Sequence, residues 1–347
     1  MNNAVFVLAL GAGLAALLRW GFKVLPDEGW QILATLPVRK DQSGRWVGVN
    51  LTYYGLLTAS GGLLAILTFL LLMGSIGQPL GPALIVVGIV LLCCLPATRL
   101  IARVVERKQH TSSVTGAVFT GMLVAPLVVT AIDRCGGAYR IPMAPAMAAL
   151  TIAYLLGEGV GRLACISFGC CYGKPLSDVG PVARRLFDKF HFAFHGATKK
   201  IAYASGLEGI KVVPIQALTS LLYLATGLAG MLLFLGSFYR SAYLLMIIVA
   251  QVWRVGSEML RADYRGEGRL TAYQKLALFG IAYAIGLCMA LPPVSGVMPE
   301  ISAGIAALWN PLVIVVLQGL WAVLFIVTGW SMVTGGVLSF HVRRDRV

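Results

Sequence analysis

The chain has 347 residues, of which 58% are hydrophobic and 12% charged, and its mean hydropathy is +0.83. Because about a quarter of the residues of a soluble domain are charged, this composition excludes a soluble globular protein and predicts a polytopic membrane protein. The formal net charge of +14 favours contact with anionic lipid head groups. It does not predict nucleic-acid binding, since the arginines and lysines are dispersed among apolar segments.

The first fifty residues combine an apolar segment with a polar one. Residues 3–18 are apolar, but they reach the length of a membrane span only if the helix extends to Val24. Residues 26–50 are polar, and Trp30 and Trp46 among them suit a membrane interface. We therefore expect an additional N-terminal helix and a polar linker in residues 1–50.

Further apolar segments long enough to cross a bilayer follow, which predicts about 8–9 transmembrane helices in all. They are residues 51–73, 84–101, 114–132, 143–163, 215–235, 241–260, 273–291 and 311–332. The second of these segments is closed by basic residues, which are typical of a cytoplasmic end. These basic residues are Arg99, Arg103, Arg107 and Lys108.

Residues 177–212 form the longest polar section between two apolar segments. The section is too hydrophilic to cross a membrane and too long for a simple turn, so we expect a small extramembrane cap. The predicted fold class is thus an all-α polytopic membrane protein with such a cap. A transmembrane core over residues 51–292 carries the cap, and residues 293–347 add a C-terminal span and a basic tail.

A charged turn closes the segment at 143–163. Arg162 stands at its end, and Gly169, Gly173 and Pro175 predict that the backbone turns tightly just beyond. A charged residue at the edge of a membrane segment is costly and by default marks a functional site. We expect the activity of the protein to lie beside Arg162.

A second charged group lies on a later segment. Arg254, Glu258 and Arg261 follow one another at i, i+4 and i+7, so they share one helix face. One interpretation is an internal ion pair of Arg254 with Glu258, with Arg261 reaching the interface. The other is that Glu258 positions the arginines, which hold an anion. Guanidinium groups suit phosphate because their planar fork donates two hydrogen bonds together, and Arg162 would complete a two-sided clamp.

Three of the seven cysteines, Cys165, Cys170 and Cys171, crowd the charged turn. They fit small packing residues, an oxidised structural pair or a thiol nucleophile, and the sequence leaves these alternatives open. The chain has no C-x-x-C pair and only four histidines, so we expect no metal site and no cofactor.

The order of these pieces resembles that of the bacterial prolipoprotein diacylglyceryl transferase family, over about residues 53–291. Two motifs carry charge: Gly161-Arg162 followed by Gly169-x-x-Tyr172-Gly173, and Arg254-x-x-x-Glu258-x-x-Arg261, which is similar to the family's R-F-x-x-E-x-x-R. Two are shorter: Val213-Pro214-Ile215-Gln216, similar to H-P-x-Q-L-Y, and Tyr54-Gly55, similar to W-Y-G.

The resemblance implies a multi-pass enzyme of the bacterial inner (cytoplasmic) membrane with its head and arginines on the periplasmic side. Such an enzyme moves the diacylglyceryl group of phosphatidylglycerol onto the cysteine thiol of a lipoprotein precursor and releases glycerol phosphate. The matching positions are then catalytic at Arg162, Arg254 and Glu258. They are substrate-binding at Tyr54, Gln216, Arg261, Cys165, Cys170 and Tyr172.

The departures from the family concern the acceptor. Cys165 and Cys170 stand where the family has asparagine and glutamate, and Thr115 stands where the histidine of its H-G-G motif would be. The donor, an anionic phospholipid, is therefore implied more firmly than a lipoprotein acceptor. Two alternatives follow: the same donor chemistry on a sugar, amine or small thiol, or a phospholipid-binding or translocating membrane protein without catalysis.

Overall fold

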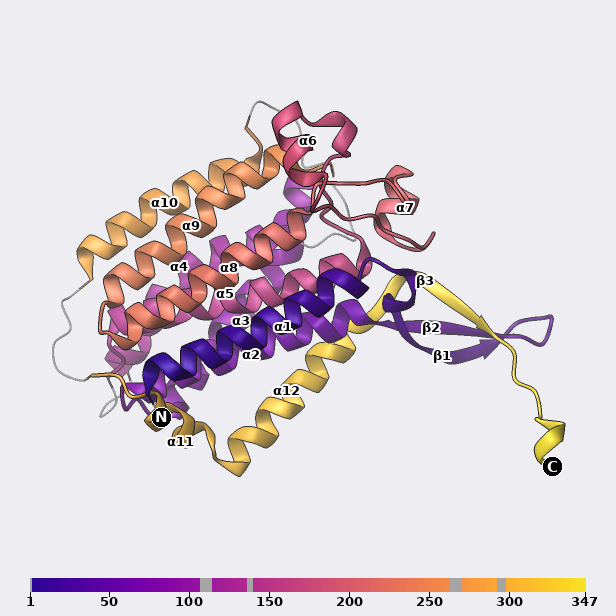
Figure 1. Ribbon diagram of the computed structural model, residues 1–347. Helices are drawn as coiled ribbons and strands as arrows, with labels where there is room; N and C mark the ends of the chain where they lie inside the picture. Colours follow the sequence, from indigo (N-terminus) through magenta and orange to yellow (C-terminus); the bar gives the residue numbers. More distant parts are fainter. Residues whose placement is uncertain (1, 107–113, 136–139, 263–269, 292–297) are drawn as a thin grey trace.

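Long helices run through one bundle that carries the cap at one end (Figure 1). The computed structural model describes residues 2–106, 114–135, 140–262, 270–291 and 298–347. Within these ranges nine helices are long and apolar enough to cross a membrane, which confirms the prediction of an all-α polytopic membrane protein. Arg107 and Lys108 of the predicted basic end lie outside the described residues.

The nine candidate spans agree closely with the predicted segments. They are α1 (Asn3–Val24), α2 (Tyr53–Ser75), α3 (Leu80–Glu106), α4 (Val114–Cys135), α5 (Met143–Phe168), α8 (Ile215–Leu235), α9 (Tyr239–Leu260), α10 (Ala272–Ala290) and α12 (Pro311–Gly329). Three short helices complete the set: α6 (Pro181–Phe187) and α7 (Lys200–Ser205) in the cap, and α11 (Ile301–Leu308) before the last span.

Helix α5 lies inside the bundle, against α2, α8 and α9. Small residues allow a close approach between α2 and α5: a Cβ atom added to Gly61 would lie 2.7 Å from the Gly157 carbonyl oxygen. A Cβ atom on Gly157 would likewise lie 2.8 Å from the Gly61 carbonyl oxygen. This backbone contact, typical of membrane helices, fixes the depth of the last turns of α5, which carry Arg162.

A three-stranded antiparallel sheet joins the two ends of the chain, which the sequence analysis did not foresee. Its order is β1 (Ile32–Lys40), β2 (Trp46–Thr52) and β3 (Trp330–Leu338), and it extends away from the bundle (Figure 1). The predicted span at 311–332 is therefore too long, because α12 ends at Gly329 and the following Val- and Thr-containing segment pairs with β2. The polar linker and the C-terminal segment thus form one unit.

The cap, residues 177–212, packs on the end of α5 through irregular segments, two short α-helices and one 3₁₀ turn. Lys199 connects it to the bundle: its buried Nζ donates to the carbonyl oxygens of Ser167 (2.7 Å) and Leu25 (3.1 Å). Burial lowers the pKa of Lys199 to about 8. The ends of α1 and α5 and the start of α7 therefore meet at one buried amine.

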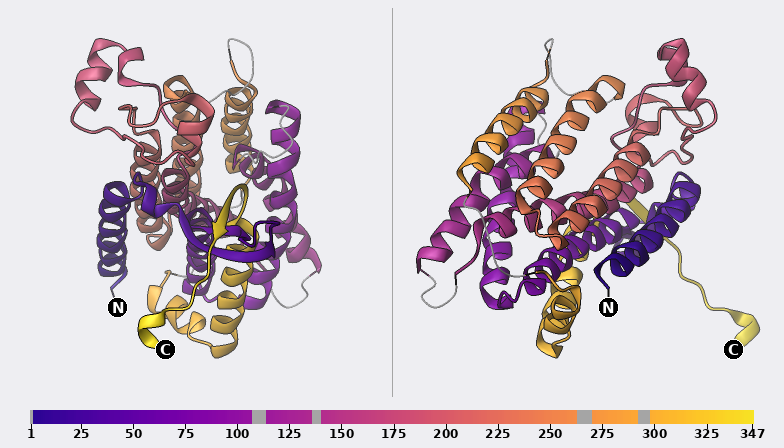
Figure 2. Two further views of the ribbon diagram at one scale, coloured as in Figure 1. Left: turned by 90° about the vertical axis from the view of Figure 1, so that its right-hand side faces the viewer. Right: turned by 60° about the vertical axis from the view of Figure 1, so that its left-hand side comes forward.

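The basic end of α3 lies on the same side of the membrane as the cap. Gly116, near the start of α4, packs against the Ala97 carbonyl and Ile101 on α3, and neighbouring Thr115 lines a cavity together with cap residues Lys200 and Tyr203. The cap is at the opposite end of the bundle from the N-terminus (Figure 2). The cap and the basic end of α3 therefore lie on one side, so the combined expectation of a periplasmic cap and a cytoplasmic α3 end is wrong as a pair.

Charge predicts the side on which this end lies. Basic residues of the cap, the sheet and the end of α3 gather there, and the positive-inside rule then makes the cap side cytoplasmic. Cys135, exposed at the end of α4, lies on the other side.

A membrane-impermeant maleimide added to intact cells should label Cys135 and spare a cysteine introduced in the cap by Val182→Cys in a Cys135→Ser background.

Val182 suits this purpose because 83% of its surface is exposed. Permeabilised cells should label both positions, which controls for reactivity. Labelling of the Val182→Cys position in intact cells would contradict the charge rule and support the orientation that the family resemblance implies.

Candidate functional site

Three charged side chains form a buried group between α5 and α9. Arg162 Nη2 forms a close ion pair with Glu158 Oε1, one helical turn away on α5, and Arg254 Nη2 lies 3.6 Å from Glu158 Oε2. The side chains of Glu158 and Arg254 are each only 7% exposed, and that of Arg162 is 12% exposed. We call these residues the ion triad; its net charge is +1 when all three are ionised.

The first of the two interpretations, an internal ion pair of Arg254 with Glu258, is wrong. Arg254 points toward α5, where Glu158 neutralises it, whereas Glu258 lies one turn further along α9. Sequence analysis missed Glu158 altogether. The signal was present, because Glu158 and Arg162 are at i, i+4 within an apolar segment, a spacing that favours an ion pair.

Hydrogen bonds from two further helices hold Arg254. Its Nη1 donates to Thr115 Oγ1 of α4 at 2.5 Å, and its Nη2 donates to the Tyr154 hydroxyl of α5 at 2.9 Å. Within the described part of the chain, the buried Nε atoms of Arg162 and Arg254 have no hydrogen-bond partner. Buried donors are nearly always satisfied, so these two unpaired N–H groups are a departure from the usual pattern that calls for an explanation.

A polar cavity of about 350 Å³ opens beside the ion triad, at the cap end of the bundle. Most of the predicted site residues line it: Tyr54, Arg162, Cys165, Cys170, Arg254, Glu258 and Arg261. Lys200 and Tyr203 of the cap and Trp253 of α9, which the sequence analysis did not single out, line it as well. The separate motifs of the sequence therefore converge on one cavity.

Gln216 and Tyr172 are not among the residues that line this cavity. Gln216 is fully buried, and its Nε2 donates to the Cys170 carbonyl oxygen at 2.8 Å. The Tyr172 hydroxyl and Ser205 Oγ are 2.5 Å apart, which ties the turn after α5 to the cap. Both residues thus position the turn that carries Cys170.

An apolar cavity of about 410 Å³ lies next to the polar one, among α2, α3, α4 and α5. Its walls consist largely of small and aliphatic residues. The two cavities share Tyr54, Val114, Arg162 and Cys165, so Arg162 stands at the boundary between a polar and an apolar space. This arrangement fits an amphiphile with a charged head and an apolar tail.

The three cysteines of the turn are half-buried in the wall of the polar cavity, and none of them is in a disulfide. Hydrogen bonds with the Cys165 and Cys171 thiols, together with burial, raise the pKa of the Cys170 thiol well above its usual value. Cys170 is therefore a protonated thiol at neutral pH. A nucleophile needs a lowered pKa, so the geometry does not favour Cys170 in that role.

No known family model matches the chain, and no curated protein matches its sequence. Arg162 and Arg254 share the carboxylate of Glu158, so the group keeps one net positive charge. Among the described residues, the buried Nε donor of each arginine has no acceptor. Guanidinium groups with a net positive charge favour an anion such as a phosphate, a sulfate or a carboxylate.

The ion triad predicts that substitution of Glu158 destabilises the protein more than substitution of Glu258. Glu158→Gln leaves two buried guanidinium groups without their counter-ion, and breaking a buried pair in this way costs about 3–5 kcal/mol. We expect a clear loss of thermal stability in detergent, measured by intrinsic fluorescence. Glu258→Gln is the matched control on α9 and should cost much less, since Glu258 does not neutralise Arg254.

A double variant, Glu158→Gln with Arg254→Gln, should lose less stability than the sum of the two single variants, because the two groups are coupled. Equal losses in Glu158→Gln and Glu258→Gln would contradict the assignment of Glu158 as the counter-ion.

Proposed function

We propose that the protein is a transferase of the bacterial cytoplasmic membrane that uses phosphatidylglycerol as donor of a diacylglyceryl group. The reaction joins this group to a nucleophilic acceptor and releases glycerol phosphate. The observation that carries the proposal is the position of Arg162 between a polar, cationic cavity and an apolar one. A phospholipid has the same sequence of parts: an anionic head, a glyceryl unit and acyl chains.

The charge of the polar cavity favours an anionic head group. Its walls contain the guanidinium groups of Arg162, Arg254 and Arg261 and the ammonium group of Lys200, against the carboxylate of Glu258. Glu158 offsets one further charge from the apolar side. The remaining excess of positive charge suits a phosphodiester, which the arginines bind through paired N–H donors.

The proposed chemistry is a displacement at carbon. The acceptor X–H attacks the glyceryl carbon next to the phosphate, an X–C bond forms, and the C–O bond to phosphate breaks. Glycerol phosphate leaves with the electron pair of that bond, and Arg162 and Arg254 stabilise the charge that develops on it. The proton of X–H passes to the Glu258 carboxylate, which lines the same cavity, and then to water.

Thr115 bears on the acceptor. Its hydroxyl accepts a hydrogen bond from Arg254, so it holds the arginine and cannot take a proton from a thiol as a histidine would. This favours an acceptor other than a lipoprotein cysteine, such as a sugar, amine or small thiol. The second candidate is a protein that binds or translocates phospholipids without catalysis. The threonine at position 115, where the resemblance implies a histidine, supports this candidate as well.

The test is turnover with labelled phosphatidylglycerol. Purified protein in mixed micelles should release labelled glycerol phosphate when a cell extract supplies the acceptor. Arg162→Gln should lower that rate by about a hundredfold or more, as expected when a donor to a developing negative charge is removed. The matched control is Arg240→Gln, since Arg240 bonds the Leu291 carbonyl at the other end of the bundle.

The same samples separate the alternatives. Release that depends on Arg162 but leaves lipoproteins unmodified supports a different acceptor. Binding of phosphatidylglycerol without release supports the non-catalytic candidate, and equal behaviour of the parent and Arg162→Gln would refute the phosphate site itself.

The apolar cavity predicts a dependence on acyl-chain length. Val118 of α4 lines this cavity, and Val118→Phe fills part of it. We expect the variant to bind a long-chain phosphatidylglycerol severalfold more weakly than the parent while a short-chain one binds almost unchanged. Leu127→Phe on the same helix is the control, because Leu127 is 69% exposed on the outer surface of the protein.

Binding is measured by native mass spectrometry of the detergent-solubilised protein with each lipid. Equal weakening of long and short chains by Val118→Phe, or the same effect from Leu127→Phe, would show that the acyl chains lie elsewhere.

A further inference from the structure

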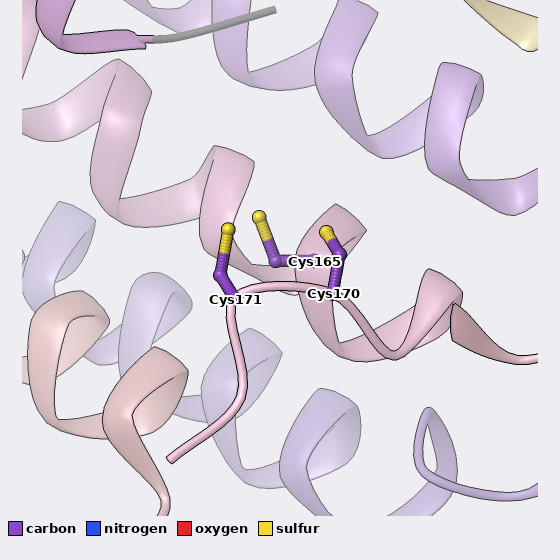
Figure 3. Close-up of side chains that lie close together, drawn as sticks. All are labelled: Cys165, Cys170 and Cys171. Atoms are coloured by element: carbon purple, nitrogen blue, oxygen red, sulfur yellow. The ribbon is translucent and has the colours of Figure 1, made fainter. Parts of the chain in front are cut away.

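Three thiols converge on one point in the wall of the polar cavity. The Sγ atoms of Cys165, Cys170 and Cys171 all lie within 4.8 Å of one another. Cys165 comes from the last turn of α5, and the other two come from the turn that follows (Figure 3). All three side chains extend to the same side of this turn (Figure 3).

The backbone of the turn is shaped to bring the thiols together. Gly169 ends α5 in the left-handed conformation, with φ 69°, and Cys171 is also left-handed, with φ 58°. Adjacent side chains of an extended chain point to opposite sides, so the turn at Cys171 is what allows it to face the same way as Cys170. Residues other than glycine rarely adopt this conformation, and it persists here where three thiols meet.

Neighbouring side chains lock the turn in place. Gln216 Nε2 holds the Cys170 carbonyl at 2.8 Å, and Lys199 Nζ holds the Ser167 carbonyl at 2.7 Å. A Cβ atom on Gly173 would lie 2.4 Å from the Val213 carbonyl oxygen, so the segment after the turn packs closely against the backbone at Val213. The cluster therefore belongs to a rigid segment.

We propose that Cys165, Cys170 and Cys171 bind one thiophilic metal ion, of which Zn²⁺ is the physiological example. Zinc–sulfur bonds of about 2.3 Å place tetrahedral sulfur ligands about 3.8 Å apart, a spacing that small side-chain rotations from the present positions reach. The inference stands apart from the lipid-transfer proposal, since it concerns the thiols alone.

The surroundings suit a complex of three thiolates. Arg162 lines the same cavity as the three cysteines, and its positive charge offsets the negative charge that they gain when metal binding displaces the thiol protons to water. All three cysteines line the polar cavity, so a fourth coordination position opens into it. Three protein ligands and one open position are the arrangement of a zinc site that accepts an exogenous ligand.

The absence of a C-x-x-C pair led the sequence analysis to expect no metal site. In the structure the three thiols meet without that spacing. Cys165 lies in the last turn of α5, and the Cys170-Cys171 pair follows it in a turn with a left-handed residue at Cys171. A contiguous cysteine pair is not a usual zinc motif, because its side chains diverge in regular structure. The turn at Cys171 removes that obstacle.

The experiment is a titration of the reduced, metal-free full chain in detergent with Cd²⁺, followed through the ultraviolet charge-transfer absorption of cadmium–thiolate bonds. We expect saturation at one ion per chain and displacement by Zn²⁺. The triple variant Cys165→Ser/Cys170→Ser/Cys171→Ser should lose the signal. Cys135→Ser and Cys288→Ser should keep it, because these cysteines lie outside the cluster.

Each single variant, Cys165→Ser, Cys170→Ser or Cys171→Ser, gives a second readout that does not need the triple variant to fold. Each should lower the charge-transfer absorption by about a third and weaken binding, since one of three thiolates is removed. The proposal is overturned if the reduced parent takes up no Cd²⁺, or if the single and triple variants bind it as the parent does. It is also overturned if Cys135→Ser abolishes the signal.

Discussion

The shared carboxylate of Glu158 is the interaction on which the site depends. Two arginines buried side by side within a membrane protein repel each other and lose their hydration. Both effects raise the free energy of the folded protein. One carboxylate between them removes most of this cost and leaves a single net positive charge. It also joins α5 to α9, so the charge is held at a fixed place near the cap end of the bundle.

The two cavities follow from that placement. Arg162 lies near the end of α5, where it lines both cavities. The apolar cavity on one side of it is lined largely by small and aliphatic residues, among them residues of α2, α4 and α5. On the other side lie the cap, the end of α9 and the turn after α5. The contact between Gly61 and Gly157 sets how deep α5 sits, and it therefore decides that the arginine lies at the boundary rather than within either space.

Much of the fold could be predicted from the sequence, because apolar segments of span length have few alternatives in a bilayer. The pairing of the charges could not be predicted. Arg254 has one possible carboxylate partner, Glu258, on its own helix and another, Glu158, on a helix distant in sequence, and only the packing of α5 against α9 selects Glu158. The sheet was missed for a similar reason: β3 pairs with β2, which is about 280 residues away in the sequence, and no local pattern reveals a pairing over that distance. The convergence of the cysteines depends on one dihedral angle at Cys171, which no pattern of residue types encodes.

The side of the membrane links the remaining features. Basic residues of the cap and of α3 gather at the end that carries the cavity, and the charge rule predicts that this end is cytoplasmic. The motif resemblance to prolipoprotein diacylglyceryl transferases, by contrast, implies a lipoprotein acceptor on the opposite, periplasmic side. Under the proposed transfer, an acceptor from the cytoplasmic side and a threonine in place of the histidine would both follow from one difference: the arginines would bind the phosphate as proposed, and the site would serve a nucleophile other than a lipoprotein thiol.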